Sequence, residues 1–527
     1  MSKRIDKFLR WLSDNDIQMD PGISIVQAET GIAVHSTAAF NHSARVAAIP
    51  KSNVLSVRTC TLSSQISWVP YGHGAVLALS LALYSEILSG KQSRWFDYLQ
   101  SLPAKIVPIA RLWGHPAAFP DETDAQEACD WIRGTEVQRE LQDDDGALLV
   151  AEIDDYYKSD VERLLLSHDL VPSLSGFFHA YSLVCSRAFL VDAYHGLCMV
   201  PVADAFNHAQ NNHVQLASEY DVCPECGSLA ECPHDQEDSI EPSRHEHPAE
   251  DVMDTVDMVA VRPIPAGVEI FNTYGAHLGS AALLARYGFI LDGCEADKVT
   301  FGWPGSGLVL QNQQEEFMEI FQEVKSGVGP LVDVSSSLHE SGHDTKEPSL
   351  SIDSYGQASL GLFVWAARNV ALDELSSAPQ AHSVTRDAIS GLLIRTFSVL
   401  LQVGIRRNMD PDVDADPITD VAALQILVKS ARTIKDLCRA RLGRVGHPKH
   451  RAASSKMLGE LLDNLPPEKC KTRYALEYLL NERAILEACA THWGELRDIV
   501  REVSRSGLHG DKHKLGRYLA NEMYTSE

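Results

Sequence analysis

The 527-residue chain lacks the sequence features that mark membrane-spanning and secreted proteins. Its best apolar stretch, Ala75–Leu88, is shorter than the ~18 uninterrupted apolar residues that span a bilayer. Ser80, Ser85 and Glu86 also interrupt it. The N-terminal residues have neither the apolar core nor the small-residue cleavage site of a signal peptide. We therefore expect Ala75–Leu88 to be a buried helix, and the chain to be intracellular, in the nucleus, the cytoplasm or both, with no membrane partner.

Basic residues are scarce. The chain has 46 Lys and Arg against 72 Asp and Glu, which gives a net charge of −26. This balance disfavours sequence-independent binding of nucleic acid by the surface as a whole and favours basic partners. The basic stretch 439–451 has no Phe, Trp or Tyr to stack on bases, so a solvated helix face explains it better. The expected partner is basic, and nucleic acid is disfavoured.

Paired cysteines are also scarce. Most of the 11 cysteines are isolated and are interpreted as reduced structural thiols, as is usual inside cells. The exceptions are Cys223, Cys226 and Cys232, which lie close together in a strongly acidic stretch and are followed by His234. The isolated cysteines are Cys60, Cys129, Cys185, Cys198, Cys294, Cys438, Cys470 and Cys489.

Strand-like patterns occur on both sides of a long helical stretch. Residues 1–18 predict a short amphipathic helix, and residues 74–186 have mainly helical periodicity. Short runs rich in Val and Ile, separated by turn residues, predict strands. These runs are residues 24–34, 46–55, 196–200, 258–262 and 269–274. The pattern predicts an α+β protein in which a β-rich domain is split by a helical insertion.

The C-terminal part has a different character. A Ser-rich stretch at 327–357 is typical of a linker or mobile loop. Helical patterns follow at 360–405, 418–442 and 474–486, and from Lys429 onward basic residues outnumber acidic ones. Together these features predict a separate helical unit.

Three short segments near the middle of the chain contain residues suited to chemistry. They are Asn207-His208, Phe271-Asn-Thr-Tyr-Gly275 and Arg286-Tyr-Gly-Phe289. Each has a structural explanation when taken alone: a loop Asn that caps its own backbone, a Tyr packed at the end of a strand, and a helix closed by Gly288.

In this order and at these distances, the segments resemble the two signature segments of a SET domain. The branch they resemble is that of the Rubisco large-subunit methyltransferase, whose members methylate non-histone proteins, ribosomal ones included. The resemblance implies a protein-lysine N-methyltransferase that uses S-adenosylmethionine (SAM). Two alternatives stay open: a protein-histidine methyltransferase of the same branch, and a catalytically silent SET fold that acts as a protein-interaction module.

The resemblance also implies roles for single residues. Tyr274 would be the active-site tyrosine, and Asn207 and His208 would contact SAM. Arg187, in a Ser-Arg-Ala-Phe stretch, would meet the SAM carboxylate, for which a guanidinium is well suited. The other expected cofactor-site residues are Gly31 and Ile32 in an N-terminal turn, Asp204, Tyr287 and Phe289.

The implied fold is a SET-type arrangement of short strands with a knot-like crossing, followed by an all-α C-terminal domain. The expected divisions are an N-terminal helix at 1–18, a SET domain at 19–295, a connecting helix and linker at 296–357, and a helical substrate-binding domain at 358–527. Within the SET domain, a helical insertion is expected at about 72–186 and an acidic Cys/His insertion at about 217–257.

The cysteine cluster has the form of a zinc knuckle. In Cys223-Pro-Glu-Cys226-Gly, the glycine lets backbone amides turn toward the sulfurs, and Cys232 and His234 would complete a tetrahedral structural zinc site. His245 and His247 are alternative fourth ligands. The other interpretation is a mobile acidic insertion in which the thiols are incidental.

Overall fold

The structure is a computed structural model in two compact units. The first unit comprises residues 1–126, 140–278 and 282–290, and the second comprises residues 127–139, 279–281 and 291–527. The structure describes residues 3–28, 31–120, 123–143, 145–218, 222–229, 232–236, 254–303, 314–329, 348–376, 386–407, 418 and 420–506.

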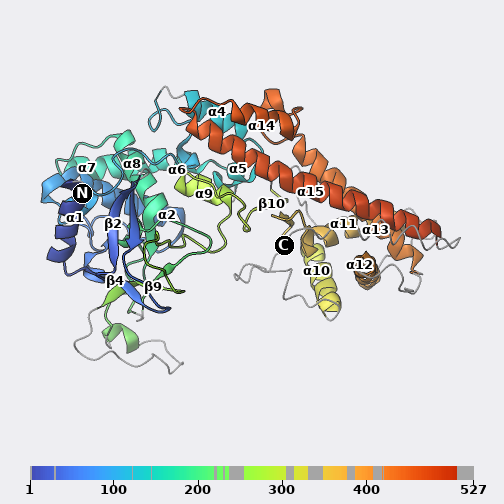
Figure 1. Cartoon of the computed structure of the whole chain (residues 1–527), viewed down its shortest axis with the longest axis horizontal. Coiled ribbons are helices and arrows are strands. Elements are labelled where there is room, and N and C mark those ends of the chain that lie inside the picture. Colours follow the sequence, from blue (N-terminus) through green and yellow to red (C-terminus); the bar gives the residue numbers. More distant parts are fainter. Residues whose placement is uncertain are drawn as a thin grey trace. The chain divides into compact units, whose positions relative to one another are not determined.

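The first unit contains short strands and a series of helices (Figure 1). Its strands are β1 (Gln18–Met19), β2 (Ile23–Ala28), β3 (Gly31–Ser36), β4 (Arg45–Pro50), β5 (Leu55–Ser56), β6 (Ala188–Leu190), β7 (Leu197–Met199), β8 (Val214–Ala217) and β9 (Thr255–Ala260). Its helices include α1 (Lys3–Asp14), α2 (Gly72–Ser89), α3 (Phe96–Leu99), α6 (Leu149–Tyr156), α7 (Glu162–Ser167) and α8 (Leu174–Arg187). Helices α4 (Thr123–Trp131), α5 (Glu136–Glu140) and α9 (Ser280–Tyr287) have residues in both units.

The strands of this unit form small antiparallel sheets. The largest has the order β1-β4-β9-β8, a second has the order β5-β7-β6, and β2 and β3 form a hairpin. Strands β5 and β6 both pair with β7, although the helices from α2 to α8 separate them in the chain. A strand-rich segment is therefore interrupted by helices and then resumed within one sheet.

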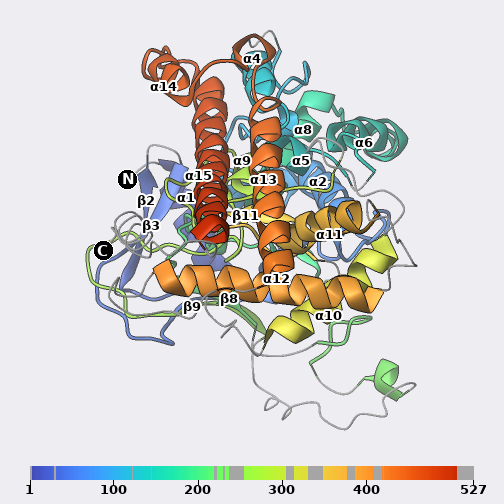
Figure 2. The same ribbon diagram turned by 90° about the vertical axis from the view of Figure 1, so that its right-hand side faces the viewer.

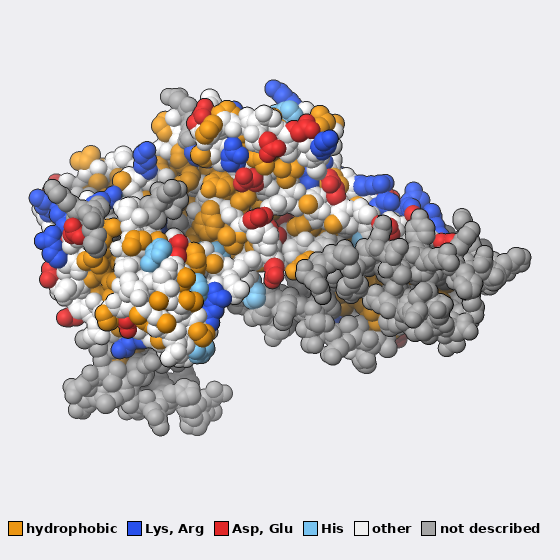
Figure 3. Space-filling model, viewed as in Figure 1, with side chains coloured by type: hydrophobic (Ala, Val, Ile, Leu, Met, Phe, Trp, Pro, Cys, Tyr) orange, Lys and Arg blue, Asp and Glu red, His pale blue; other side chains and the backbone are white. Residues whose placement is uncertain are grey.

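Helix α2 is the best membrane-span candidate by length and composition, and it is a core helix. A 61% share of its apolar window is buried inside the protein. It packs against α8 and contacts β5 and β7. The surface of the first unit seen in Figure 3 mixes hydrophobic, charged and other polar side chains. The expectation of a buried helix at Ala75–Leu88 is confirmed.

The segment 269–274, predicted to be a strand, does not form a regular one. Glu269 makes an isolated antiparallel bridge to His35, while Asn272 makes parallel bridges to His208 and Val214. The prediction was wrong because this segment crosses between several partners and does not follow one strand. A period-2 apolar pattern reports an extended backbone but not the identity of its neighbours.

Helix α9 ends as the sequence predicts, at a glycine. Gly288 has φ +80°, and its amide donates a hydrogen bond to the carbonyl of Leu283. A Cβ built on Gly288 would lie 3.0 Å from the carbonyl oxygen of Pro108, which is backbone and cannot rotate away. This position therefore requires glycine for two reasons, the left-handed backbone and the close approach.

We expect Gly288→Ala to lower the free energy of unfolding by about 2–4 kcal/mol, because it adds steric crowding to the cost of a left-handed alanine. Urea denaturation of the purified protein measures this. Gly267→Ala is the matched control, because Gly267 has φ +83° but its built Cβ meets nothing within 4 Å. The control should lose only about 1–2 kcal/mol. Equal losses in the two variants would contradict the close-approach argument.

The second unit is mainly helical (Figure 2). Helices α13 and α15 pack along each other, and α11 and α12 pack against α13. Its other elements are β10 (Lys298–Thr300), α10 (Gln314–Val328), β11 (Ser351–Asp353), α11 (Leu360–Ser376), α12 (Arg386–Arg407), α13 (Val421–Leu442), α14 (Ser455–Asp463) and α15 (Cys470–Ser506).

Part of the Ser-rich stretch 327–357 is built into this unit. Strand β11 pairs antiparallel with β10, and Leu350 and Ile352 are buried in the core. Residues 330–347 of the stretch lie outside the described part of the chain. Strand β11 was not predicted because serines alternate with the buried Leu350 and Ile352, so the stretch has the composition of a linker.

A buried ionic cluster lies in the second unit. The Arg441 guanidinium is fully buried, and its Nη2 lies 3.1 Å from Glu136 Oε1 and 3.2 Å from Glu482 Oε1. Glu136 also accepts hydrogen bonds from the backbone amide and hydroxyl of Thr300, at 2.9 and 2.6 Å. The Glu136 amide in turn donates to Glu482 Oε2 at 2.8 Å. The cluster therefore joins a short segment around residue 136 to α13, α15 and β10.

Candidate functional site

The two predicted signature segments are in direct backbone contact. The amide of Asn272 donates to the carbonyl of Asn207 at 2.8 Å, and the amide of Ala209 donates to the carbonyl of Asn272 at 3.1 Å. His208 and Asn272 form a parallel bridge. Residues more than sixty positions apart thus meet at one crossing point, and Tyr274 is placed beside His208.

The His208 ring is fixed by the crossing. Its Nδ1 accepts a hydrogen bond from the Tyr274 amide at 3.1 Å, so the ring carries its proton on Nε2 when it is neutral. Burial lowers the pKa of His208, which keeps it neutral at physiological pH. The ring stacks on Tyr274, with centroids 5.0 Å apart. His208 therefore positions Tyr274 through both backbone and ring.

Tyr274 lies in an aromatic cluster. Its ring stacks on Tyr287 at 4.6 Å, and Phe289 lies edge-on at 6.4 Å. Its hydroxyl donates to the carbonyl of Phe206 at 3.2 Å. Burial raises the pKa of Tyr274 to about 12, although the positive charge of Arg187 opposes it, so the hydroxyl stays protonated at neutral pH. It can orient a group by hydrogen bonding but is not an anionic base.

Asn207 is held by a residue that the sequence did not single out. Its side-chain amide donates to Glu269 Oε1 at 2.7 Å. Glu269 stands at the start of the crossing segment, so a carboxylate of one signature segment orients the Asn207 side chain of the other. The Val-Glu-Ile pattern around Glu269 gave no separate signal, because it reads as ordinary strand alternation.

Arg187 and Asp204 are linked to each other and to a third residue. The Arg187 guanidinium donates to the Asp204 carbonyl at 3.1 Å, and the Tyr98 hydroxyl donates to Asp204 Oδ2 at 2.7 Å. Asp204 is 5% exposed, and burial raises its pKa to about 6 despite the opposing effects of Arg187 and Tyr98. Sequence reasoning missed Tyr98 because it lies in the helical segment, 106 residues from its partner.

The raised pKa of Asp204 predicts a pH-dependent stability difference from Asp204→Asn. The ordinary pKa of an aspartate is 3.8, and that of Asp204 in the folded protein is about 6. The buried carboxyl therefore favours the fold at low pH, and this contribution is lost as the pH rises from about 4 through 6. The wild type should therefore lose about 1–2 kcal/mol relative to the variant between pH 5 and pH 8. Urea unfolding of both proteins across this range measures the difference, and a flat difference would contradict the prediction.

Two pockets meet at Arg187 and Asp204, which line both. The first pocket is also lined by Gly31 and Ile32 of β3, and the second also by Tyr274 and Tyr287. The two residues thus belong both to a recess beside the N-terminal hairpin and to a recess beside the aromatic cluster. Asn207, His208 and Phe289 are not among the lining residues of either pocket.

The loop before the crossing has an unusual backbone. Val202 is fully buried and has φ 72° and ψ −48°, a region that β-branched residues avoid. Such a conformation costs on the order of 1–3 kcal/mol and persists only where the surrounding packing imposes it. Here it precedes η5 (Ala203–Ala205), which carries Asp204.

Several polar atoms around the crossing are buried without a hydrogen-bond partner in the described part of the chain. They are Nε of Arg187, Nε2 of His208 and both side-chain amide atoms of Asn272, a residue that is 1% exposed. Unpaired buried polar groups cost free energy, so a cluster of them points to a polar ligand. The Arg187 guanidinium suits a carboxylate.

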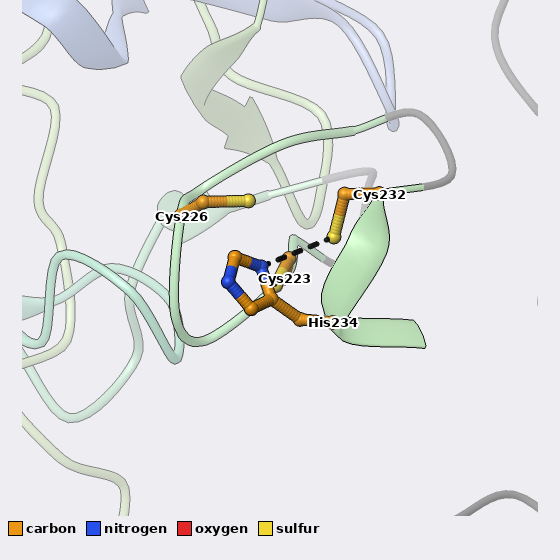
Figure 4. Close-up of side chains that lie close together, drawn as sticks. All are labelled: Cys223, Cys226, Cys232 and His234. Carbon is orange, nitrogen blue, oxygen red and sulfur yellow. Dashed lines mark hydrogen bonds between the residues drawn. The ribbon is translucent and has the colours of Figure 1, made fainter. Parts of the chain in front are cut away.

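The predicted metal ligands also converge. The ligand atoms of Cys223, Cys226, Cys232 and His234 all lie within 4.8 Å of one another (Figure 4). His234 belongs to the short 3-10 helix η6 (Pro233–Gln236). The alternative ligands His245 and His247 lie outside the described residues.

Known proteins match the sequence over part of the chain only. No family model matches the chain. The chain is 31% identical over 179 residues to ribosomal lysine N-methyltransferase 3 of Saccharomyces cerevisiae, which covers 26% of this chain and 32% of that protein. It is 29% identical over 266 residues to N-lysine methyltransferase SETD6 of Homo sapiens, with 46% and 44% covered. The matches span a third to a half of these relatives' lengths.

Solved structures decide the fold. The chain matches the SET domain of LSMT bound to lysine and AdoHcy with a TM-score of 0.58 and 15% identity, over 98% of this chain and 99% of that one. Rubisco LSMT bound to sinefungin and monomethyllysine matches with a TM-score of 0.58 and 14% identity, over 98% and 100%. The chain has the SET-domain fold. Together with the lysine methyltransferases that match in sequence, these structures confirm the predicted resemblance to the Rubisco large-subunit methyltransferase-like branch. The mixed architecture of helices and strands is also confirmed.

Proposed function

We propose that this SET-fold protein is a SAM-dependent protein-lysine N-methyltransferase that acts on a non-histone protein such as a ribosomal protein. The observation that carries the proposal is the pair of pockets that share Arg187 and Asp204. A methyl transferase of this kind needs two substrates that approach one point from separate sides. The names of the yeast and human relatives favour lysine as the acceptor.

The first pocket is the proposed cofactor site. Arg187 would pair with the carboxylate of SAM, and Gly31 and Ile32 would follow the cofactor along β3 with backbone groups. The buried unpaired Nε of Arg187 is consistent with such a ligand. Ala33, where the family usually has a second glycine, has a buried side chain and pairs with Val26 within a regular strand. A glycine at residue 33 is therefore unnecessary for the hairpin.

Asn207, His208 and Phe289 line neither pocket, and they would complete the proposed cofactor site through their contacts with one another and with the segment that carries Tyr274. Asn207 is held by Glu269 and would present its amide oxygen to the SAM amino group. His208 would contribute through its backbone, which forms a parallel bridge with Asn272. Phe289 packs on the His208 ring, with ring centroids 6.1 Å apart.

The second pocket is the proposed lysine channel. Tyr274 and Tyr287 would enclose the lysine side chain, and their rings provide an apolar wall that favours the neutral amine. The Tyr274 hydroxyl donates to the Phe206 carbonyl, so its lone pairs remain able to accept a hydrogen bond from that amine. When bound, SAM supplies the methyl group: its sulfur–carbon bond breaks as the lysine nitrogen–carbon bond forms. The residues act by alignment, which alone can supply much of the acceleration.

The finer architecture is part of the proposal. The parallel bridges of Asn272 support a knot-like crossing, and the placement of α2 to α8 between β5 and β6 supports a helical insertion in the SET domain. The helices from α11 to α15 would form the C-terminal substrate-binding domain at 358–527. The described residues in that range contain no strand, in keeping with an all-α domain.

The proposed substrate is basic and the proposed location is the nucleus or cytoplasm. A net charge of −26 attracts a lysine-rich protein over distances up to about the Debye length, roughly 8–10 Å at physiological salt. Association should therefore weaken as salt rises.

Transfer of labelled methyl groups tests the proposal. Purified wild type and Tyr274→Phe are incubated with methyl-labelled SAM and salt-washed ribosomal proteins, and in parallel with whole-cell extract. We expect a discrete labelled band with wild type alone, and methyllysine after hydrolysis of that band. Label in methylhistidine would favour the histidine-methylating alternative. Neither labelling nor calorimetric SAM binding would favour the interaction module.

A further inference from the structure

Four side chains between β8 and β9 form a compact cluster that the proposed methyl transfer does not use. We propose that Cys223, Cys226, Cys232 and His234 bind one structural Zn²⁺ ion. Figure 4 shows the three sulfurs and the imidazole directed toward a common centre, and their ligand atoms lie within 4.8 Å of one another. The inference does not depend on any methyltransferase activity.

The distances match a tetrahedral site. Zinc–sulfur and zinc–nitrogen bonds of about 2.3 and 2.0–2.1 Å place sulfur and nitrogen ligands about 3.6 Å apart across a tetrahedral ion. His234 Nδ1 lies 3.6 Å from Cys232 Sγ and 3.8 Å from Cys223 Sγ. All three cysteines are free thiols in the structure. The four ligand atoms lie within 4.8 Å of one another, which is the range expected around one central ion.

The backbone around Cys223 has the form of a metal knuckle. The Gly227 amide donates to the Cys223 carbonyl at 2.8 Å, and the Cys223 amide donates to the Ser228 carbonyl at 3.0 Å. Gly227 has φ +73°, as the turn requires. The loop is therefore shaped before any ion binds.

The knuckle is attached to the core of the first unit. A Cβ on Gly227 would lie 2.7 Å from the Tyr194 ring, so the turn packs directly on that ring. The Arg58 guanidinium lies over Tyr194 at 4.9 Å and over Trp68 at 4.6 Å. Cys223 itself is buried. The proposed ion would thus hold the first part of the acidic insertion against the packed side chains of Tyr194, Arg58 and Trp68.

The far end of the insertion is anchored by charge. Buried Lys51 forms ion pairs with Asp254 at 2.8 Å and with Asp192 at 3.0 Å, and its amide donates to the Asp254 carbonyl at 2.9 Å. Asp254 directly precedes β9. Asp192 lies two residues before Tyr194. The ion pair of Lys51 and the contact of Gly227 therefore both involve the loop between β6 and β7. A metal at the knuckle would complete the attachment of the insertion at its two ends.

Ligand chemistry selects zinc. Three thiolates and one imidazole are soft and borderline donors, which suit Zn²⁺ and disfavour Mg²⁺ and Ca²⁺. Four protein ligands also leave no open position, so the ion would be structural and not catalytic.

Metal analysis of the full chain tests the proposal. After removal of any affinity tag and gel filtration, we expect about one zinc per chain by plasma mass spectrometry, as for a closed structural site. Cys223→Ser and His234→Ala should each lose most of this zinc. Cys470→Ser is the matched control, because Cys470 is an exposed free thiol outside the cluster, and it should keep its zinc.

Cobalt substitution of the wild type gives an answer that does not depend on how the variants fold. Co²⁺ in the site should show the intense visible bands and thiolate charge-transfer band of a tetrahedral sulfur-rich centre, and Zn²⁺ should displace it. An octahedral cobalt spectrum would overturn the proposal. So would less than about a tenth of a zinc per chain after zinc is supplied in equimolar amount, or a disulfide between Cys223 and Cys226 in the freshly purified protein.

Discussion

Tyr274→Phe is expected to fold and bind SAM like the wild type while its turnover falls by about 10²–10³-fold, the usual effect of deleting one preorganised hydroxyl at a reacting centre. The ring is retained, so stacking on His208 and Tyr287 persists. The loss is the hydroxyl, which lies 3.2 Å from the Phe206 carbonyl and belongs to a residue that lines the proposed lysine channel. Single-turnover methyl transfer and calorimetric SAM binding measure the two effects separately.

The pKa of Tyr274 sharpens the test. Because burial raises this pKa to about 12, the hydroxyl does not ionise in the neutral range. The pH profile of wild-type turnover should therefore show no step from Tyr274 below about pH 10. A step near neutral pH that disappears in Tyr274→Phe would show that the tyrosine acts as a base.

Tyr84→Phe is the matched control for the same chemical change. The Tyr84 hydroxyl also donates to a backbone carbonyl at 3.2 Å, that of Ser173, but in the helical part of the first unit. Deleting it should cost roughly 1–3 kcal/mol of stability and leave turnover within about twofold of wild type. Equal turnover by wild type and Tyr274→Phe would remove Tyr274 from the proposed mechanism.

Arg441→Met is expected to lower the free energy of unfolding by about 3–5 kcal/mol, because it leaves two buried carboxylates without their shared cation. Glu136 and Glu482 are 4% and 1% exposed, so water cannot replace the guanidinium. Burial, partly offset by Arg441, already raises the pKa of Glu482 to about 7. Without Arg441, at least one carboxyl must take up a proton. Calorimetric or urea unfolding of the full chain measures the loss.

Two further variants separate charge from packing. Arg441→Met/Glu482→Gln should recover at least half of the lost stability, because Glu136 keeps its two hydrogen bonds from Thr300. Arg432→Met, on the same helix α13, removes an exposed ion pair to Asp436 and should cost less than about 1 kcal/mol. A loss in Arg441→Met no larger than in Arg432→Met would contradict the buried-cluster argument.

Several features of the candidate site could be predicted from the sequence because its residues stand in short, recognisable segments. Gly288 closes the helix that leads to Phe289, and the four ligand atoms of the cysteine cluster converge. Local spacing encodes both features, since turn residues and helix ends act within a few positions. The segments with Asn207-His208 and with Tyr274 also meet, but this contact was expected from the resemblance to SET domains and not from local spacing.

Other parts of the site could not be predicted. No local sequence pattern marks the roles of Tyr98, Glu269 and Val202. Tyr98 and Glu269 make hydrogen bonds to residues far away in the chain, and Val202 has a strained backbone. Both kinds of feature arise from tertiary packing. His213 is a further example: its Nδ1 accepts the amide of Phe271 at 3.1 Å, in the same way that His208 accepts that of Tyr274. Read in the sequence, His213 is only a polar residue after two asparagines.

The sequence by itself determined the order of elements, the helix and strand character of most segments, and the residues that resemble a SET site, because these depend on periodicity and short-range spacing. The tertiary structure alone decided that residues 269–274 cross several partners, that residues 127–139 and 348–353 join the second unit, and that Arg187 and Asp204 line two pockets. The physical reason is that such long-range contacts depend on which surfaces are buried together, and no local pattern records that choice.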